Sequence, residues 1–109
     1  MKIKLCSLML VFCLLAIACD NKMVVSYEIA GKTLIETHRA LIEAKNNNLI
    51  SQEKYNKIMP NFLKAADIHY KAGDALLLYL NKQPNDYLNL ITQFNIIIAD
   101  IVLWIKEGE

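Results

Sequence analysis

The sequence predicts an all-α fold, a small antiparallel three-helix bundle, on the basis of three observations. Apolar residues recur every three or four positions over long runs, as they do on the buried face of an α-helix. The 109 residues include only three glycines and two prolines, so few positions interrupt these runs. Two short polar stretches, residues 46–48 and 81–83, separate three apolar segments, and such short connections favour neighbouring antiparallel helices.

The first predicted helix runs from about Val24 to Lys45. Asn46, Asn47 and Asn48 follow it, and asparagine tolerates the left-handed backbone conformation, so the triplet predicts a helix C-cap and a turn. The apolar face of this helix consists of residues three or four positions apart, namely Tyr27, Gly31, Leu34, His38 and Leu41, flanked by Ile35 and Ile42.

Ser51 predicts the start of the second helix, because its hydroxyl can accept a hydrogen bond from an unpaired amide of the first turn. Glu53 complements the positive end of the helix dipole. Pro60 lacks an amide hydrogen and clashes with the carbonyl of Asn56, so we expect a kink or a short break near Met59. The predicted apolar face comprises Tyr55, Ile58, Met59, Phe62, Ala65, Ala66, His69, Ala72, Gly73, Leu76 and Leu80.

A third helix is predicted after the polar loop, with Pro84 in its first turn and Asp86 close behind. Residues 88–105 are also apolar enough to suggest a membrane span, but Asp100 alone would cost about 2.5–3.5 kcal/mol near a bilayer centre. Further polar side chains interrupt the segment, so we favour a core helix over a membrane span. Its apolar stripe comprises Tyr87, Leu90, Ile91, Phe94, Ile97, Ile98, Ile101, Trp104 and Ile105.

Residues 1–18 have the three parts of an export signal peptide. Lys2 and Lys4 give the segment a basic start, and residues 5–17 form an apolar run. The run is 13 residues long, shorter than the ~20 residues of a helix that spans a bilayer, which favours a cleaved signal over a permanent anchor. It leads into the small residue Ala18, after which we expect cleavage.

The end of this segment, Ala16-Ile17-Ala18-Cys19, resembles the lipobox of bacterial lipoproteins. The usual lipobox reads Leu, then Ala or Ser, then Gly or Ala, then Cys, so Ala18 and Cys19 fit it whereas Ala16 and Ile17 depart from it. The resemblance implies cleavage before Cys19 by signal peptidase II. It also implies that Cys19 carries a diacylglyceryl thioether and acyl chains such as palmitate. Residues 19–109 then form a single helical domain anchored to the membrane through Cys19.

The cysteine positions favour lipidation over two other processing routes, an ordinary secretory signal cut after Ala18 and an uncleaved signal anchor. All three cysteines, Cys6, Cys13 and Cys19, lie in the N-terminal segment, so a cut before Cys19 leaves one. One cysteine cannot form an intramolecular disulfide, and in an exported protein a free thiol is open to oxidation. A thioether removes that hazard, and two or more acyl chains hold a protein stably on a membrane.

Asp20 directly follows the cysteine that the lipobox resemblance marks for acylation. This arrangement is similar to the sorting signal that retains lipoproteins of enteric bacteria in the inner membrane. We therefore expect a lipid-anchored protein of the bacterial cell envelope. If the host is Gram-negative, we expect it on the inner membrane, facing the periplasm.

The charge balance argues against nucleic acid as a partner. The full chain has 12 basic and 11 acidic side chains, but Lys2 and Lys4 leave with the signal and no acidic residue does, so the mature chain has a net charge of about −1. Arg39 is its single arginine. Proteins that bind phosphate backbones need a clustered basic face, which this composition does not provide.

His38 and His69, the only histidines, lie on the predicted apolar faces and are the weak candidates for a metal site or an acid–base pair. Helices that bind metal through HExxH or ExxH motifs carry a second ligand three or four positions away. The corresponding neighbours here are aliphatic residues or glycine. We therefore expect core or boundary histidines, and we assign no metal ligand, no catalytic residue and no cofactor. The neighbours are Leu34, Ile35, Leu41 and Ile42 for His38, and Ala65, Ala66, Ala72 and Gly73 for His69.

Other catalytic motifs are absent from the sequence. It contains no CxxCH haem site, no cysteine pair for thiol exchange, no glycine-rich phosphate loop and no GxSxG nucleophile motif. Asp67 and Asp74 share a helix face, but Lys64 and Lys71 lie between them, which is typical of solvated surface charge rather than of a glycosidase pair. We interpret the larger aromatic residues as packing and helix-rim residues, namely Tyr55, Tyr70, Tyr79, Tyr87 and Trp104.

Two classes of function remain. The first is a small lipid-anchored helical protein without enzymatic activity, which binds a protein partner in the envelope as an accessory, inhibitor or exclusion-type factor. This class rests on analogy with small single-domain lipoproteins. The alternative is a small metal-binding or hydrolytic helical bundle that uses His38 and His69. Elemental analysis and the identity of the proteins that co-purify with the mature chain would distinguish the two.

Overall fold

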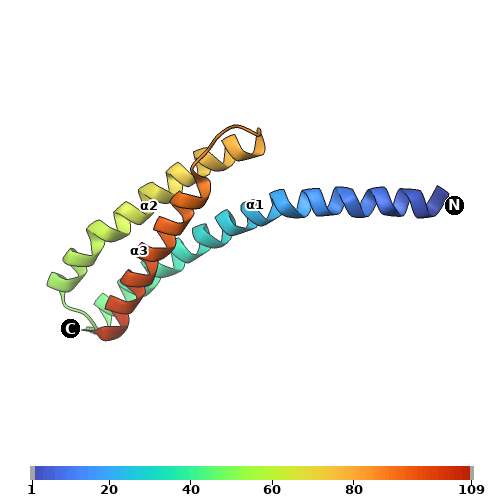
Figure 1. Cartoon of the computed structure of the whole chain (residues 1–109). Coiled ribbons are helices and arrows are strands. Elements are labelled where there is room, and N and C mark those ends of the chain that lie inside the picture. The colour runs from blue at the N-terminus through green and yellow to red at the C-terminus, as the bar shows by residue number, and fades with distance from the viewer. Residues whose placement is uncertain (1, 109) are drawn as a thin grey trace.

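The fold is an all-α bundle of three helices. The computed structural model describes the backbone of residues 2–108 and the side chains of residues 22–108. Helices α1 (Lys2–Asn46), α2 (Gln52–Leu80) and α3 (Tyr87–Glu107) pack against one another in every pairwise combination, most extensively α2 against α3. In Figure 1, α2 and α3 lie beside the C-terminal half of α1, and α1 continues beyond them. The predicted three-helix architecture is confirmed.

Helices α1 and α2 end in the same way, through a residue in the left-handed backbone conformation. Asn48 has φ 59° and Lys82 has φ 57°. The amide of the residue after each one donates to the carbonyl five positions earlier, Leu49 to Ala44 at 2.8 Å and Gln83 to Leu78 at 2.8 Å. This is the Schellman arrangement, which satisfies carbonyls at the end of a helix. The turn predicted at the asparagine triplet is therefore confirmed.

Helix α2 begins where the sequence predicts and continues through its proline. The backbone amide of Lys54 donates to the Ser51 hydroxyl at 3.0 Å, which makes Ser51 the N-cap. Pro60 lies inside a helix that is continuous from Gln52 to Leu80, so the structure shows no break there. Ile58 and Phe62 are buried on either side of the exposed proline, and we attribute the continuity to this packing, which offsets the lost backbone bond.

Helix α3 begins later than predicted. Pro84 lies in the connection rather than in the first turn, because the helix starts at Tyr87 with Asp86 as its N-cap. The Schellman closure of α2 occupies the chain up to Gln83, and the following residues cross to the start of α3. The Asn85 side chain then accepts the amide hydrogen of Tyr87 at 3.1 Å, whereas Asp86 makes no side-chain cap bond. Asn85, not Asp86, therefore satisfies an amide at the start of α3.

The core lies where the three helices meet, and most of the predicted stripes contribute to it. Tyr87, Phe94, Leu41 and Ile101 are its largest fully buried side chains. The predictions are wrong for three side chains that are exposed, Ile35 at 63%, Ile42 at 36% and Leu80 at 42%. The buried residues that the predicted stripes did not include are Ala30, Thr37, Ala44, Ile50, Ile68 and Ala75.

Candidate functional site

A hydrogen-bonded junction joins the start of α3 to α1. Tyr87 is 1% exposed, and its hydroxyl donates to the backbone carbonyl of Met23 at 3.0 Å. The Ser26 hydroxyl lies 2.5 Å from the Tyr87 hydroxyl and also donates to the Met23 carbonyl at 2.8 Å. Each hydroxyl has one hydrogen, so the two groups share two hydrogens among these three contacts, and in the Ser26–Tyr87 contact either oxygen can be the donor. Among residues 22–108, no buried side-chain polar atom lacks a hydrogen-bond partner. The junction fixes α3 against α1 near the point where α1 leaves the bundle.

Burial of this tyrosine also changes its acidity. Desolvation raises the pKa of the Tyr87 phenol above its ordinary value of 10.0. The hydrogen bond from Ser26 acts in the opposite direction, and the nearby Tyr27 hydroxyl raises the pKa further. The neutral phenol is therefore the form that the bundle favours. The neutral hydroxyl is the form that donates to the Met23 carbonyl.

His69 lies in an aromatic cluster between α1, α2 and α3. Its ring stacks on Tyr27 with a centroid distance of 4.3 Å and an interplanar angle of 8°, and it meets Phe94 at 5.6 Å. Its Nε2 atom is 3.4 Å from the Tyr27 carbonyl oxygen. The Tyr27 hydroxyl lies against Gly73, so a Cβ atom at position 73 would come within 2.6 Å of this hydroxyl oxygen. These contacts make His69 a packing residue.

His38 stacks on a different aromatic ring and does not meet His69. Its partner is Phe62, with a centroid distance of 5.0 Å and an interplanar angle of 23°. Phe62 and His69 are seven residues apart on α2, about 10 Å along the helix axis. The structure therefore does not bring the two histidines together. Among residues 22–108, no group of three or more His, Cys, Asp or Glu side chains could hold a metal ion.

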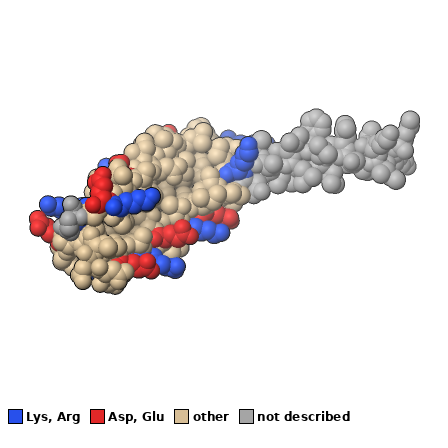
Figure 2. Space-filling view, turned by 90° about the horizontal axis from the view of Figure 1, so that it is seen from below, with Lys and Arg blue, Asp and Glu red and all other residues tan. Residues whose placement is uncertain are grey.

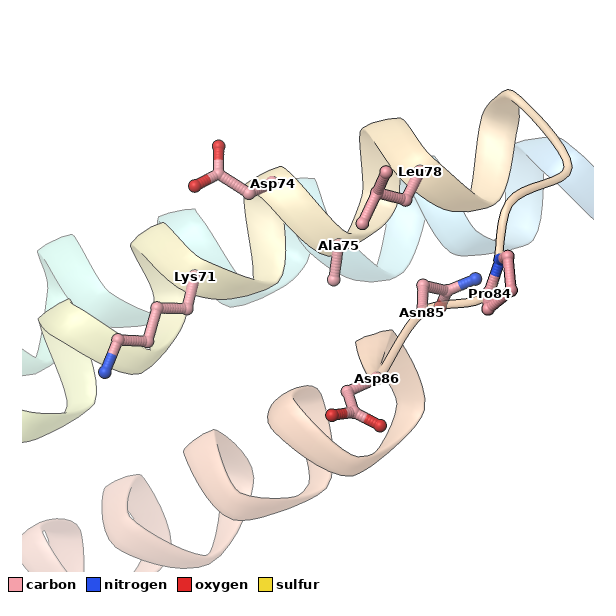
Figure 3. Close-up of a pocket in the computed structure, with 7 residues that line it drawn as sticks. All are labelled: Lys71, Asp74, Ala75, Leu78, Pro84, Asn85 and Asp86. Carbon is pink, nitrogen blue, oxygen red and sulfur yellow. The ribbon is translucent and has the colours of Figure 1, made fainter.

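A shallow pocket of about 540 Å³ lies between the second half of α2 and the connection to α3. Figure 3 shows Leu78 and Ala75 pointing toward this connection, whereas Asp74 points to the opposite side of α2. Lys71, at the far end of the pocket, pairs with Asp67 at 3.0 Å on the exposed surface of α2. The carboxylates of the pocket do not converge, and the Asp67 contact confirms the prediction of solvated surface charge.

Helix α3 presents a row of exposed, uncharged side chains on its outer side. Thr92, Ile96, Ala99 and Leu103 are all exposed and lie four, three and four residues apart, a spacing that places them along one line of the helix. We call this row the outer face of α3. Figure 2 shows a broad uncharged surface on the face in view, with charged side chains along its lower edge and near both ends of the described part.

Helix α3 is also the only helix of the described residues that is long and apolar enough to cross a membrane by length and composition. Its mean hydropathy is 1.8, and only 22% of the most apolar stretch is buried in the bundle. A core helix and a membrane span share these properties. The buried stripe that packs on α1 and α2 agrees with the predicted core helix, and the outer face is the part that the bundle leaves uncovered.

The other predicted site residues have different outcomes. Tyr87 is a core residue, and Tyr55 packs beneath the Lys45 ammonium group, 4.7 Å from the ring centroid. Tyr70 is 71% exposed and is not a packing residue. Ala18 and Cys19, the predicted cleavage and lipidation positions, lie outside the residues whose side chains the structure describes. The outer face of α3 was missed because Ile96, Ala99 and Leu103 lie inside the continuous apolar blocks 96–99 and 101–105, where they do not stand out from the residues of the buried stripe.

Comparisons with known proteins do not assign this chain to a family. No family model, no curated protein and no solved structure matches the chain. Functional reasoning therefore rests on the residues and the fold alone.

Proposed function

We propose that this protein is a small lipid-anchored helical module of the bacterial envelope that binds a protein partner and has no enzymatic activity of its own. The outer face of α3 carries the proposal. Ile96 is 58% exposed and Leu103 is 52% exposed, on a helix that is otherwise anchored in the core. Contiguous exposed apolar surface on a folded domain commonly marks an interaction site.

The geometry of the outer face suits another helix. Alternating spacings of four and three residues generate a straight ridge, which packs between the side chains of a second helix at 8–10 Å between axes, as a general rule. Ala99, near the middle, permits close approach of the partner backbone. The charged residues of α3 are Asp100, Lys106 and Glu107. Lys106 and Glu107 lie at its C-terminal end, whereas the exposed Asp100 flanks the row beside Ala99, where it can pair with a polar or basic side chain of the partner. An apolar helix of another envelope protein fits these features.

The membrane attachment is proposed from the lipobox resemblance. Cleavage before Cys19 and acylation of its sulfur would place the domain on a membrane, and Asp20 would favour the inner membrane with the domain in the periplasm. Replacement of Cys19 by Ala should abolish incorporation of labelled fatty acid and leave unprocessed precursor. Normal labelling of the C19A protein would contradict the proposed anchor. Density-gradient fractionation of membranes would locate the mature protein.

The partner is tested by photo-crosslinking in cells. A photoreactive residue at Ile96 should form an adduct with one defined envelope protein, whereas the same residue at the exposed control position Lys64 on α2 should not. The substitution Ile96→Asp should remove the phenotype that depends on the partner, and Lys64→Asp should not. Absence of adducts from Ile96, or an adduct only with a second copy of this chain, would contradict the proposal.

The alternative function, a metal-binding or hydrolytic bundle, has less structural support. His38 and His69 stack on separate aromatic rings, and neither has a carboxylate contact among the described residues. Elemental analysis of the purified protein tests the alternative. Stoichiometric zinc that is lost when either histidine is replaced by Gln would favour a metal site over the interaction module.

A further inference from the structure

Exposed leucines gather at one end of the bundle. Leu77, Leu78 and Leu80 lie in the last turn of α2, and Leu88 lies in the first turn of α3; their exposed fractions are 60%, 45%, 42% and 61%. We call this group the leucine end. Val25 of α1, 39% exposed, belongs to the same end of the bundle, since α3 starts beside Met23 and Ser26. Single exposed leucines are ordinary, but a group at one end of a small domain indicates a contact.

The leucine end is the end from which α1 leaves the bundle. Figure 1 shows the connection between α2 and α3 at the same end as the exit of α1. The Tyr87 hydroxyl is 3.0 Å from the Met23 carbonyl, and Cys19 precedes Met23 by four residues. Because a chain extends at most ~3.6 Å per residue, Cys19 lies within about 14 Å of Met23 whatever its conformation. An acyl anchor on Cys19 would therefore hold the leucine end close to the lipid surface.

We infer that the leucine end rests on the membrane, with its leucines in the interfacial layer of the lipid and the long axis of α3 directed away from the surface. This inference rests on the proposed acylation of Cys19. The distal end of the bundle, where α1 turns into α2 and α3 ends, would then face the aqueous compartment. The outer face of α3 would extend outward from the membrane, where a helix of a neighbouring envelope protein can reach it.

The arrangement of the leucines favours lipid over a protein partner at this end. Leu78 lines the shallow pocket between α2 and the connection, whereas Leu88 lines a separate pocket beside Met23 and Tyr79. The leucines therefore do not share one groove, and a deformable surface fits them better than a single helix does. The exposed Lys22 and Lys82 lie at the same end, where ammonium groups can reach lipid phosphates while their stems cover apolar surface. Asp86 is the acidic side chain in the connection itself, and it offsets part of the attraction of these two lysines to lipid phosphates.

Site-specific fluorescence on the full acylated protein tests the inference. Cys6 and Cys13 leave with the signal and Cys19 is blocked by lipid, so an introduced cysteine is the one reactive thiol. An environment-sensitive fluorophore is attached to L88C or, as a matched control, to L103C, which is 52% exposed near the other end of α3. Both proteins are reconstituted into phosphatidylethanolamine–phosphatidylglycerol vesicles, with and without brominated lipid.

The expected result is a blue-shifted emission for the Leu88 probe that brominated lipid quenches, together with a water-like, unquenched emission for the Leu103 probe. Water-like emission from both probes would overturn the inference. Quenching of both would also overturn it, because α3 would then lie flat on the membrane. Mass spectrometry of the purified protein measures the acylation of Cys19 separately. An unacylated Cys19 refutes the anchor and the docking together, whereas an acylated Cys19 with a water-exposed Leu88 probe refutes the docking alone.

Discussion

Removal of the Phe94 ring is the most direct test of the bundle core. The side chain is 0% exposed, packs in the centre of α3 and meets the His69 ring at 5.6 Å. Phe→Ala substitutions in cores typically cost about 3–5 kcal/mol, since they lose apolar burial and leave a cavity. The chain from Asp20 to Glu109 has 90 residues (109 − 19) and, at ~0.05–0.15 kcal/mol per residue, a free energy of unfolding of about 5–14 kcal/mol. Phe94→Ala therefore removes about a fifth of the stability or more.

Urea unfolding followed by far-UV circular dichroism measures this loss on a soluble chain that starts at Asp20. With a slope of about 1.5 kcal/mol per molar urea, a loss of 3 kcal/mol lowers the midpoint by about 2 M. The matched control is Ile96→Ala on the same helix, where the side chain is 58% exposed, and its effect should stay within about 0.5 kcal/mol. A loss below about 1 kcal/mol for Phe94→Ala, or one equal to that of the control, would refute this packing of α3.

Two further substitutions test the contacts of α1. Tyr87→Phe should cost about 1–3 kcal/mol, because it removes a buried hydroxyl that donates to the Met23 carbonyl at 3.0 Å. Because the pKa of Tyr87 is raised in the folded state, the contribution of its neutral phenol to the free energy of unfolding is complete below pH 10.0 and is lost as the pH rises above that value. Unfolding measured as a function of pH should show a smaller loss in the Tyr87→Phe variant. Gly73→Ala should destabilise the fold by about 1–3 kcal/mol in the same urea assay, because the new carbon would lie 2.6 Å from the hydroxyl of Tyr27. The control is Gly31→Ala, which should be neutral or stabilising because its nearest contact is at 3.4 Å.

The features that were predictable from the sequence are those that local physics determines. The Asn48 turn and the Ser51 cap depend on residues within a few positions of each other, and the structure confirms both. The stripe of α3 was predictable for the same reason, since a period of 3.6 residues selects one face. The start of this helix was not predictable, because after the closure of α2 through Lys82 and Gln83 the chain uses residues 84–86 to reach α3. The sequence pattern had placed Pro84 in the first turn of α3.

The remaining features depend on which helix lies beside which, and periodicity does not contain this information. Ile35 and Thr37 are two positions apart on α1, yet the isoleucine is 63% exposed and the threonine is 4% exposed, because the positions of α2 and α3 decide which flank is covered. The stacking of His69 on Tyr27 and the bond from Tyr87 to Met23 join residues 42 or more positions apart. The outer face of α3 lies opposite the predicted buried stripe, and that α1 and α2 leave it uncovered follows from the packing rather than from the periodicity.

The hydrogen bond from Tyr87 to Met23 has a consequence for the order in which the protein can fold during synthesis. Its two partners are 64 positions apart, so at about 5–20 residues per second the tyrosine is made roughly 3–13 s after the methionine. During this interval α1 can pair with α2 at most, and the side that α3 later covers stays open. A chaperone that binds nascent apolar helices therefore has several seconds in which α1 is accessible. A translational pause before residue 87 would lengthen that period, and synthesis of α3 would end it.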